Sequence, residues 1–270
     1  GSIKKPFEAS FLMLHSQENS MRILLITVWK PRKGGIVTHV ENLIKHSDNE
    51  FKILTYENRI NLPILRALNF VFFGFFRGMR EDFEIIHAHY AVPQGFLGVL
   101  LKKALHKPLV VTLHGSDVTI LGRGAAKFLV RFVLNNCDAI IAVSEFLKKE
   151  AIKLGAEEEK IKVIYSGVPA REEKSEEFQI GGKVITFMGS LAWQKGVDVL
   201  IRAFRDVKKL QDAELVIVGD GRERKTLQKI SDELGIKADF LGYRENVGSV
   251  LEKSSVLVLP SREEGFGLAL

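Results

Sequence analysis

The feature that most constrains the fold is a repeated alternation of short apolar runs with longer segments of helical periodicity. The apolar runs are continuous, without polar residues at every second position, as expected for parallel strands covered by helices on both faces. The pattern predicts an α/β fold built on doubly wound parallel sheets. In the first half, the predicted strands are Arg22–Val28, Phe51–Thr55, Glu84–Ala88, Leu109–Leu113, Ala139–Val143 and Lys162–Tyr165, and the predicted helices are Val37–Lys45, Leu62–Met79, Gln94–Leu105, Ala125–Asn135 and Glu145–Leu154.

A polar interruption divides the chain into two domains. The sequence Ser166-Gly-Val-Pro169 leads into a charged stretch that ends in Gly181-Gly182, which is typical of a linker. We therefore predict a leader or cloning remnant over residues 1–20, a Rossmann-like domain over 21–168, a linker over 169–182 and a second Rossmann-like domain over 183–270. The second domain is expected to be incomplete, with the strands Val184–Met188, Leu215–Val218, Asp239–Leu241 and Val256–Leu259 and the helices Val197–Leu210, Arg222–Leu234 and Asn246–Ser254.

Composition limits the class of protein and of partner. The 270 residues are 46% hydrophobic and 27% charged, as in a globular chain, and the single cysteine, Cys137, excludes an internal disulfide framework and fits the cytoplasm. The net charge of +6 comes from the first half of the chain. A basic half fits an anionic acceptor or a membrane surface, and it equally fits an ordinary solvated surface. No nucleic-acid-binding motif accompanies it, so no nucleic-acid partner is expected.

The segment 62–76 is rich in phenylalanine and apolar except for Arg66 and Asn69. It is shorter than the roughly 20 apolar residues that a transmembrane helix needs. We expect a helix that packs in the core, with insertion into a membrane surface as the alternative.

Glycine turns follow several predicted strands and open onto predicted helices. Such turns let backbone N–H groups approach a ligand, and the helix N-terminus favours an anion such as a phosphate. The turns are Gly34-Gly35, the segment from Gly189 to Gly196 that contains Lys195, Val218–Gly221, and Gly265–Gly267. Their common position at the carboxyl edges of two sheets indicates a phosphate-containing ligand. Glu264, directly before the last turn, is better suited to sugar hydroxyls than to phosphate.

Histidines end two neighbouring predicted strands. His87 and His89 close one strand, and His114 follows the next, with Asp117 three residues later. We expect His87 to be a core histidine and His114 to be functional. A metal site is not expected, because no cysteine, His-x3-His or Asp-x-Asp pattern joins these residues.

In order and in coverage, these segments resemble the GT-B-fold retaining glycosyltransferases of family 4 (glycosyl transferase group 1). The resemblance extends from Met21 almost to the end of the chain. The matching segments are Gly34–Val40, His87–His89, Thr112–Asp117, Ala142–Ser144, Lys160–Ile164, Gly189–Gly196, Val218–Gly221, Phe240–Tyr243 and Pro260–Leu268.

The resemblance implies transfer of a hexose-type sugar, with retention, from a nucleotide-diphosphate sugar to an acceptor hydroxyl. The expected catalytic residues are Lys195, which stabilises the departing diphosphate, Glu264, which contacts the transferred sugar, and His114. His89 and Asp117 are expected to bind the acceptor, a carbohydrate or lipid-linked sugar. No cofactor and no metal are implied. The expected donor-binding residues are Gly34, Gly35, Gly189, Ser190, Gly219, Asp220, Tyr243, Gly265, Phe266 and Gly267.

The chain departs from the family pattern in three places. Ser190 stands where the family usually has arginine, and Ser166 where it usually has asparagine. The family also has an E-x7-E motif, of which Glu264 matches the first glutamate. The second would fall beyond Leu270, so we expect a truncated chain that dimerises through its second domain. Two alternatives stay open: a non-catalytic chain that binds an acceptor or partner, and a nucleotide-sugar epimerase. Peripheral contact with the inner membrane surface also stays open.

Overall fold

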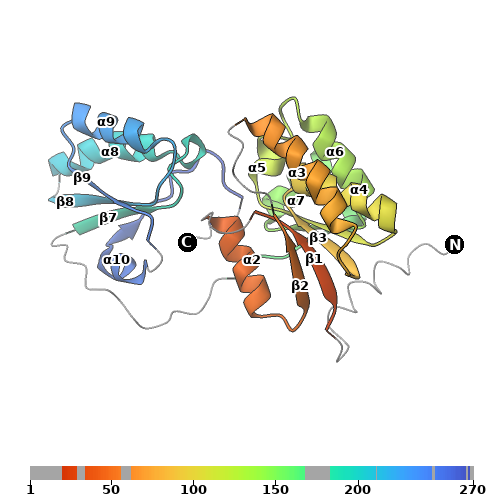
Figure 1. Ribbon diagram of the computed structural model, residues 1–270. Helices are drawn as coiled ribbons and strands as arrows, with labels where there is room; N and C mark the ends of the chain where they lie inside the picture. Colours follow the sequence, from red (N-terminus) through yellow and green to blue (C-terminus); the bar gives the residue numbers. More distant parts are fainter. Residues whose placement is uncertain are drawn as a thin grey trace. The chain divides into compact units, whose positions relative to one another are not determined.

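The computed structural model describes residues 20–28, 34–55, 62–167, 183–210, 212–244, 247–265 and 267. The chain divides into two compact units, Gly1–Gly167 and Val168–Leu270, each of which is a separate α/β domain (Figure 1). The predicted leader, apart from residue 20, and the predicted linker lie outside the described residues.

The first unit contains a six-stranded parallel sheet with the strand order β2-β1-β3-β4-β5-β6. This order reverses between β1 and β3, which creates a topological switch point at which α/β proteins bind ligands. The strands are β1 (Arg22–Ile26), β2 (Glu50–Leu54), β3 (Ile85–His89), β4 (Leu109–Leu113), β5 (Ala139–Ala142) and β6 (Ile161–Val163).

Helices cover both faces of this sheet, as the continuous apolar strands require. Val40 of α2 packs with Ile23, Leu25 and Ile85 on one face. On the other face, Gly98 of α4 lies against Leu109 and the side chain of Ala88, where a Cβ would meet Leu109 at 2.7 Å. The helices of this unit are α2 (Gly35–Lys45), α3 (Pro63–Gly78), the π-helical turn η1 (Ala91–Gly95), α4 (Phe96–Leu105), α5 (Ser116–Thr119), α6 (Lys127–Asn136), α7 (Glu145–Lys153) and the 3-10 turn η2 (Glu158–Lys160).

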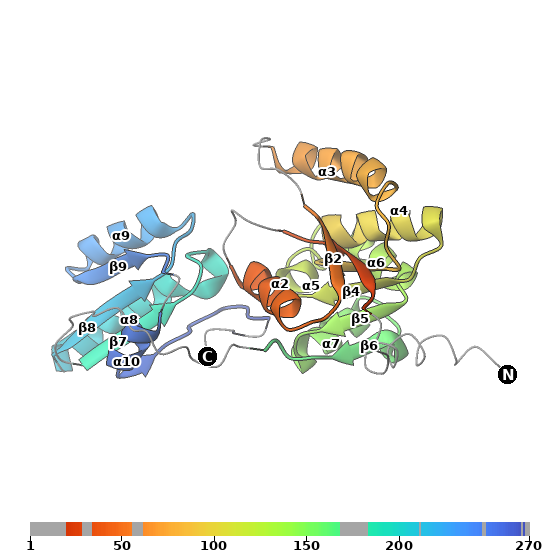
Figure 2. The ribbon, with the colours of Figure 1, turned by 60° about the horizontal axis from the view of Figure 1, so that its bottom comes forward.

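The helix α3 is not the core helix that its apolar sequence predicted. It follows β2 and packs on α4 through Gly74 and Gly78, while much of its apolar surface faces away from the unit (Figure 2). The prediction was wrong because the segment is apolar all round, and periodicity alone does not tell which side is covered. No helix in the described part of the chain is both long enough and apolar enough to cross a membrane.

The second unit contains a four-stranded parallel sheet with the strand order β10-β7-β8-β9. Here the order reverses between β7 and β10, so this sheet also has a switch point. In Figure 1 the helices α8 and α9 cover one face of this sheet and α10 covers the other. Its elements are β7 (Lys183–Met188), the 3-10 turn η3 (Trp193–Lys195), α8 (Val197–Leu210), β8 (Ala213–Val218), α9 (Arg224–Glu233), β9 (Ala238–Gly242), α10 (Gly248–Lys253) and β10 (Val256–Leu257).

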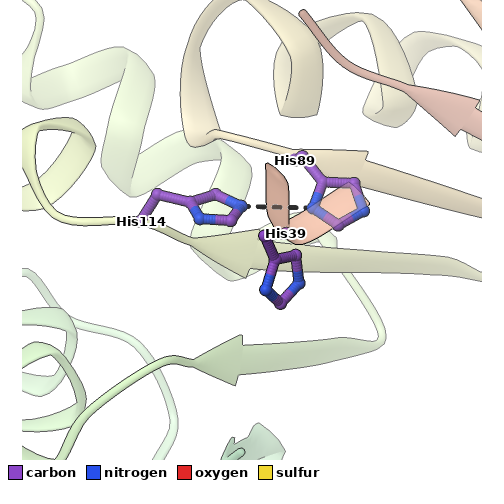
Figure 3. Close-up of side chains that lie close together, drawn as sticks. All are labelled: His39, His89 and His114. Carbon is purple, nitrogen blue, oxygen red and sulfur yellow. Dashed lines mark hydrogen bonds between the residues drawn. The ribbon is translucent and has the colours of Figure 1, made fainter. Parts of the chain in front are cut away.

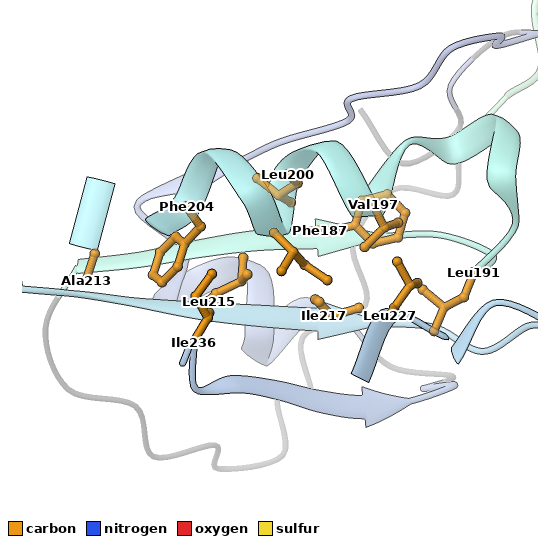
Figure 4. Packing of buried hydrophobic residues seen from close by; sticks show 11 residues of the cluster. Phe187, Leu191, Val197, Leu200, Phe204, Ala213, Leu215, Ile217, Leu227 and Ile236 are labelled. Carbon is orange, nitrogen blue, oxygen red and sulfur yellow. The ribbon is translucent and has the colours of Figure 1, made fainter. Parts of the chain in front are cut away.

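A single large apolar cluster holds α8 and α9 on the sheet of the second unit (Figure 4). Phe187 of β7 and Phe204 of α8 are among its fully buried side chains. A smaller cluster around Val216 and Val250 attaches α10 to the opposite face. The predicted fold class is confirmed: both domains are Rossmann-like, with parallel sheets covered by helices.

Candidate functional site

The switch point of the first unit is lined by three histidines from different elements. His39 lies on α2, His89 is the last residue of β3, and His114 directly follows β4. Figure 3 shows the imidazoles of His89 and His114 pointing towards each other with His39 beside them. The Nδ1 atom of His89 and the Nε2 atom of His114 are hydrogen-bonded at 3.1 Å. The ring of His39 lies 5.4 Å from that of His89 and 5.1 Å from that of His114.

Burial keeps these imidazoles neutral. Desolvation, with repulsion from the neighbouring rings, lowers the pKa of His114 to about 3 and the pKa of His89 well below its usual value. Desolvation also lowers the pKa of His39. A neutral imidazole has one N–H donor and one acceptor nitrogen, so the cluster can bind hydroxyl groups in either direction.

Side-chain hydrogen bonds orient two histidines at this edge of the sheet: His39, a member of the cluster, and His87, which precedes His89 on β3. The Oγ atom of Ser166 lies 2.9 Å from Nδ1 of His39, and the Oγ1 atom of Thr112 lies 2.7 Å from Nε2 of His87. His87 was expected to be a satisfied core histidine; it has this hydrogen bond, but its side chain is half-buried. Within the described residues, by contrast, the buried Nε2 atom of His89 has no hydrogen-bond partner. Such an atom costs free energy in the folded state, which is more common at functional sites than elsewhere.

Asp117 holds the turn that carries His114. Its carboxylate accepts hydrogen bonds from the backbone N–H groups of Gly115 (2.8 Å) and His114 (3.2 Å). Desolvation raises the pKa of the fully buried Asp117 to about 6, although these backbone hydrogen bonds act in the opposite direction. The observed contacts of Asp117 are therefore internal to the site. Its expected role in acceptor binding stays a prediction.

The three histidines are also the one group of potential metal ligands in the described part of the chain. One nitrogen from each of His39, His89 and His114 lies within 4.8 Å of the other two. Zinc–nitrogen bonds of about 2.1 Å require tetrahedral ligand nitrogens about 3.4 Å apart. A metal would replace the His89–His114 hydrogen bond. The three histidines can thus supply metal ligands, but in the structure His89 and His114 are hydrogen-bonded to each other.

The N-terminus of α2 lies at the same carboxyl edge. Gly34 has φ 138°, a conformation that side chains rarely adopt, and Gly34 and Gly35 are both exposed. No side chain caps this helix, and its first turn contains no acidic residue. Its first N–H groups are therefore suited to an anion or a hydroxyl.

In the second unit, the switch point brings Lys195 and Glu264 together. Lys195 ends the turn η3 after β7, and Glu264 lies in the loop after β10, sixty-nine residues later. The Nζ atom of Lys195 donates to Oε2 of Glu264 at 2.6 Å, and Ser261 donates to the same oxygen at 3.0 Å. The two charged side chains are partly exposed, at 23% and 32%. A partly exposed cation and carboxylate at a switch point can bind a phosphate and a hydroxyl, respectively.

Arg262 holds the loop that carries Glu264 against the start of α8. Its guanidinium donates two hydrogen bonds to Asp198, at 2.8 and 2.7 Å, and one to the carbonyl of Trp193 at 2.8 Å. It also lies over the Trp193 ring, 4.9 Å from its centroid. These contacts lower the pKa of Asp198 and raise that of Arg262. No sequence pattern singles out Arg262, Asp198 or Trp193.

The glycine turns of this unit pack directly on one another. At Gly219, which has φ 135°, a Cβ would lie 1.8 Å from the carbonyl oxygen of Gly189. At Gly196 a Cβ would lie 2.1 Å from the carbonyl oxygen of Pro260. These glycines are therefore required by backbone packing at the carboxyl edge. Whether they also contact a donor stays a prediction.

The remaining predicted donor-binding residues lie along the same edge. Asp220 accepts from the N–H of Gly221 at 2.8 Å and is 3.5 Å from Arg224. Ser190 is exposed, as is Tyr243 with 45% of its surface accessible. Gly265 and Gly267 have intermediate exposure, and Phe266 lies outside the described residues.

Comparison with known proteins decides the family. Glycosyltransferase Family 4 matches residues 33–172, and Glycosyl transferases group 1 matches residues 170–270. The chain belongs to glycosyltransferase family 4. An uncharacterized glycosyltransferase of Methanocaldococcus jannaschii is 35% identical over 92% of this chain and 74% of the relative. The N-acetyl-alpha-D-glucosaminyl L-malate synthase of Bacillus anthracis is 31% identical over 71% of this chain and 54% of the relative.

A solved structure with the same fold is that of HepE from Anabaena in complex with UDP and glucose. The TM-score is 0.65 at 18% identity, over 92% of this glycosyltransferase chain and 77% of HepE. The GT-B fold and the resemblance to family 4 are thus confirmed, and the chain is a glycosyltransferase by its family.

Two residues of the histidine site were not predicted from the sequence. His39 was part of the Gly34–Val40 motif but received no role, although its position one turn into a helix after a glycine turn indicates the carboxyl edge. Tyr90, which follows His89, has φ 99°, and its hydroxyl is 2.6 Å from Ser116. A strained tyrosine gives no signal in the sequence, because its conformation is imposed by the surrounding fold.

Proposed function

We propose that the protein transfers a hexose-type sugar, with retention and without a metal ion, from a nucleotide-diphosphate sugar to an acceptor hydroxyl. The observation that carries the proposal is the Lys195–Glu264 pair at the switch point of the second unit. HepE binds UDP and glucose, and the Bacillus anthracis relative is named for an N-acetylglucosaminyl product. The two names support a hexose as the transferred sugar, and the HepE complex supports a nucleoside diphosphate as its carrier.

In this proposal, Lys195 stabilises the negative charge that develops on the departing diphosphate. Its ammonium group is held by Glu264 at 2.6 Å, so it is already oriented before the donor binds. The Glu264 carboxylate then accepts hydrogen bonds from hydroxyls of the transferred sugar. The N–H groups of the backbone at Gly265 and Gly267 supply further donors for phosphate oxygens.

The neutral histidines of the first unit bind sugar hydroxyls. His114 lies near the reacting sugar and His89 near the acceptor in this scheme, with Asp117 fixing the turn that carries His114. The acceptor is a carbohydrate or a lipid-linked sugar, and the protein works in the cytoplasm with peripheral contact to the inner membrane surface. The basic first half of the chain supports an anionic acceptor.

The test is a transfer assay with a panel of nucleotide-diphosphate hexoses and candidate acceptors. Lys195→Ala should lower the transfer rate by about 100-fold, because it removes a preorganised charge at the leaving group. Lys229→Ala is the matched control, since Lys229 is an exposed lysine of α9 that pairs with Glu233. Unchanged turnover in the Lys195 variant would remove this residue from the mechanism. Formation of an epimer without any acceptor would indicate an epimerase instead.

Metal independence has its own test. After treatment with EDTA and removal of the chelator, transfer should continue at the original rate, because no step of the scheme uses a metal. Loss of activity that zinc restores, together with a stoichiometric metal that disappears in His39→Ala, would show that the histidine cluster holds a metal after all.

A further inference from the structure

One side of α3 exposes a row of large apolar side chains. The spacing of these residues places them on a single side of the helix, because residues three and four apart are neighbours on a helix surface. We call this row the outer face of α3. It consists of Leu65 (52% exposed), Leu68 (61%), Phe72 (59%), Phe73 (61%) and Phe76 (49%).

The exposure of this row is fixed by the packing of the opposite side. Phe70 is buried, and Gly74 and Gly78 lie so close to α4 that a Cβ would meet Leu97 and Leu101 at 2.7 Å. The helix cannot rotate to bury its outer face without losing these contacts. In Figure 2, α3 lies at the outside of its unit, on the far side of α4 from the sheet.

The charges around the outer face are positive. Arg66 and Arg77 are about three turns apart and lie along one edge of the face, and Arg80 follows the helix. No acidic residue occurs from Leu62 to Arg80.

The acidic residues that follow the helix have basic partners. Glu81 lies 3.8 Å from Arg77, whereas Asp82 and Glu84 both pair with Arg22. Glu81 thus offsets part of the charge of Arg77, whereas Asp82 and Glu84 are partly neutralised by Arg22 of β1. From Leu62 to Arg80 the charged residues are all basic.

We propose that the outer face of α3 inserts into the interface of a membrane that contains anionic lipids. Phenylalanine and leucine on one side, arginine at its edge and a length too short to span are the properties of an interfacial helix. With 16 residues, α3 is about 24 Å long and would lie in the membrane plane. Arginine next to the apolar row favours lipid phosphates over a partner surface that is only apolar. The inference deepens the peripheral membrane contact of the proposed function and rests on it.

The test is flotation of the full chain with two kinds of vesicle, phosphatidylcholine alone and phosphatidylcholine with 30% phosphatidylglycerol. We expect binding to the anionic vesicles, weaker binding to the neutral ones, and at least a tenfold loss of binding in Phe72→Ser/Phe76→Ser. Arg66→Gln/Arg77→Gln should lose the preference for anionic vesicles. The matched control is Phe128→Ser, which removes an equally exposed phenylalanine (67%) from α6.

Three results would overturn the inference, two from flotation and one from light scattering. One is equal vesicle binding by the wild type and Phe72→Ser/Phe76→Ser, and another is no binding by the wild type. The third is a dimer in light scattering that Phe72→Ser/Phe76→Ser converts to a monomer, because the face would then join two copies of the chain. Binding of UDP, measured by calorimetry on the same variants, should be unchanged. Absence of binding of UDP, GDP and ADP alike by the wild type would instead count against the proposed function, whereas the vesicle result alone decides the role of the outer face of α3.

Discussion

Single glycines at the carboxyl edge of the second sheet have a packing role that can be separated from any role in binding. Gly219, at this edge, has φ 135°, and Gly235, which lies between α9 and β9 at the opposite edge of the sheet, has φ 64°. A Cβ at Gly219 would lie 1.8 Å from the Gly189 carbonyl oxygen, whereas at Gly235 nothing lies within 4 Å. The two positions thus differ in space and also in backbone strain, because φ 64° lies in the left-handed region that other residues can adopt, whereas φ 135° lies outside it.

We expect Gly235→Ala to lower the free energy of unfolding by about 1 to 2 kcal/mol, which is the cost of the left-handed conformation alone. Gly219→Ala should cost about 3 kcal/mol or more, because the backbone must also shift. Urea unfolding followed by circular dichroism measures both values. Equal losses in the two variants would show that the Gly219–Gly189 contact relaxes freely.

At the level of elements, the loop after β10 depends on Arg262. Its bidentate pair with Asp198 and its bond to the Trp193 carbonyl connect this loop to η3 and α8, which carry and follow Lys195. Glu264 follows Arg262 by two residues in this loop, so the ion pair of Arg262 with Asp198 also anchors the backbone next to Glu264. Arg262 is therefore a positioning residue for the Lys195–Glu264 pair.

We expect Arg262→Ala to lower kcat/KM for the nucleotide sugar by about tenfold, because the two charged groups lose their fixed separation. Arg262→Lys should recover little of this loss, since lysine cannot form the bidentate bond. Arg205→Ala, at an exposed arginine of α8 that pairs with Asp206, should leave kcat/KM unchanged. Recovery of full activity by the lysine variant would show that only the charge of Arg262 matters.

The elements themselves were largely predictable from the sequence. Every predicted strand and helix is present, and Leu109–Leu113 and Val197–Leu210 have the predicted bounds. Parallel strands covered on both faces are continuous apolar runs, so their pattern is strong. The structure differs most from the prediction at α3. The sequence of this helix is apolar on nearly every side, so it does not show which side packs against the rest of the unit. The Arg262 contacts were not predictable either, because they join residues sixty-four positions apart in the chain.

For the site, the sequence placed His89, His114, Lys195 and Glu264 at strand ends, and the structure brings them together in pairs within each unit. Their roles stay predictions, as does a dimer formed through the second unit. Side-chain hydrogen bonds such as His39–Ser166 depend on the final packing of distant segments, which no local pattern contains.

For the molecule as a whole, the buried histidines make stability depend on pH. Burial lowers the pKa of His87 and of His114 to about 3 and the pKa of His89 well below its usual value, whereas the unfolded chain keeps values near 6.5. Below pH 6.5 the unfolded state therefore binds more protons than the folded state, so the free energy of unfolding decreases as the pH is lowered. Asp117 acts in the opposite direction, because its pKa of about 6 lets the folded state take up a proton between pH 6 and 4.

The histidines outnumber this single carboxyl, so we expect a net loss of stability between pH 7 and pH 5, with about 1 to 2 kcal/mol from each of His87 and His114. Urea unfolding of the chain at the two pH values measures the loss. His87→Gln should reduce it, because glutamine does not titrate, whereas His46→Gln at the exposed end of α2 should leave it unchanged. If His87→Gln lost as much stability on acidification as the wild type, the imidazole of His87 would have to be protonated in the folded protein. His87 would then carry a positive charge at pH 5, and this edge of the first sheet would favour an anionic ligand over a neutral hydroxyl group.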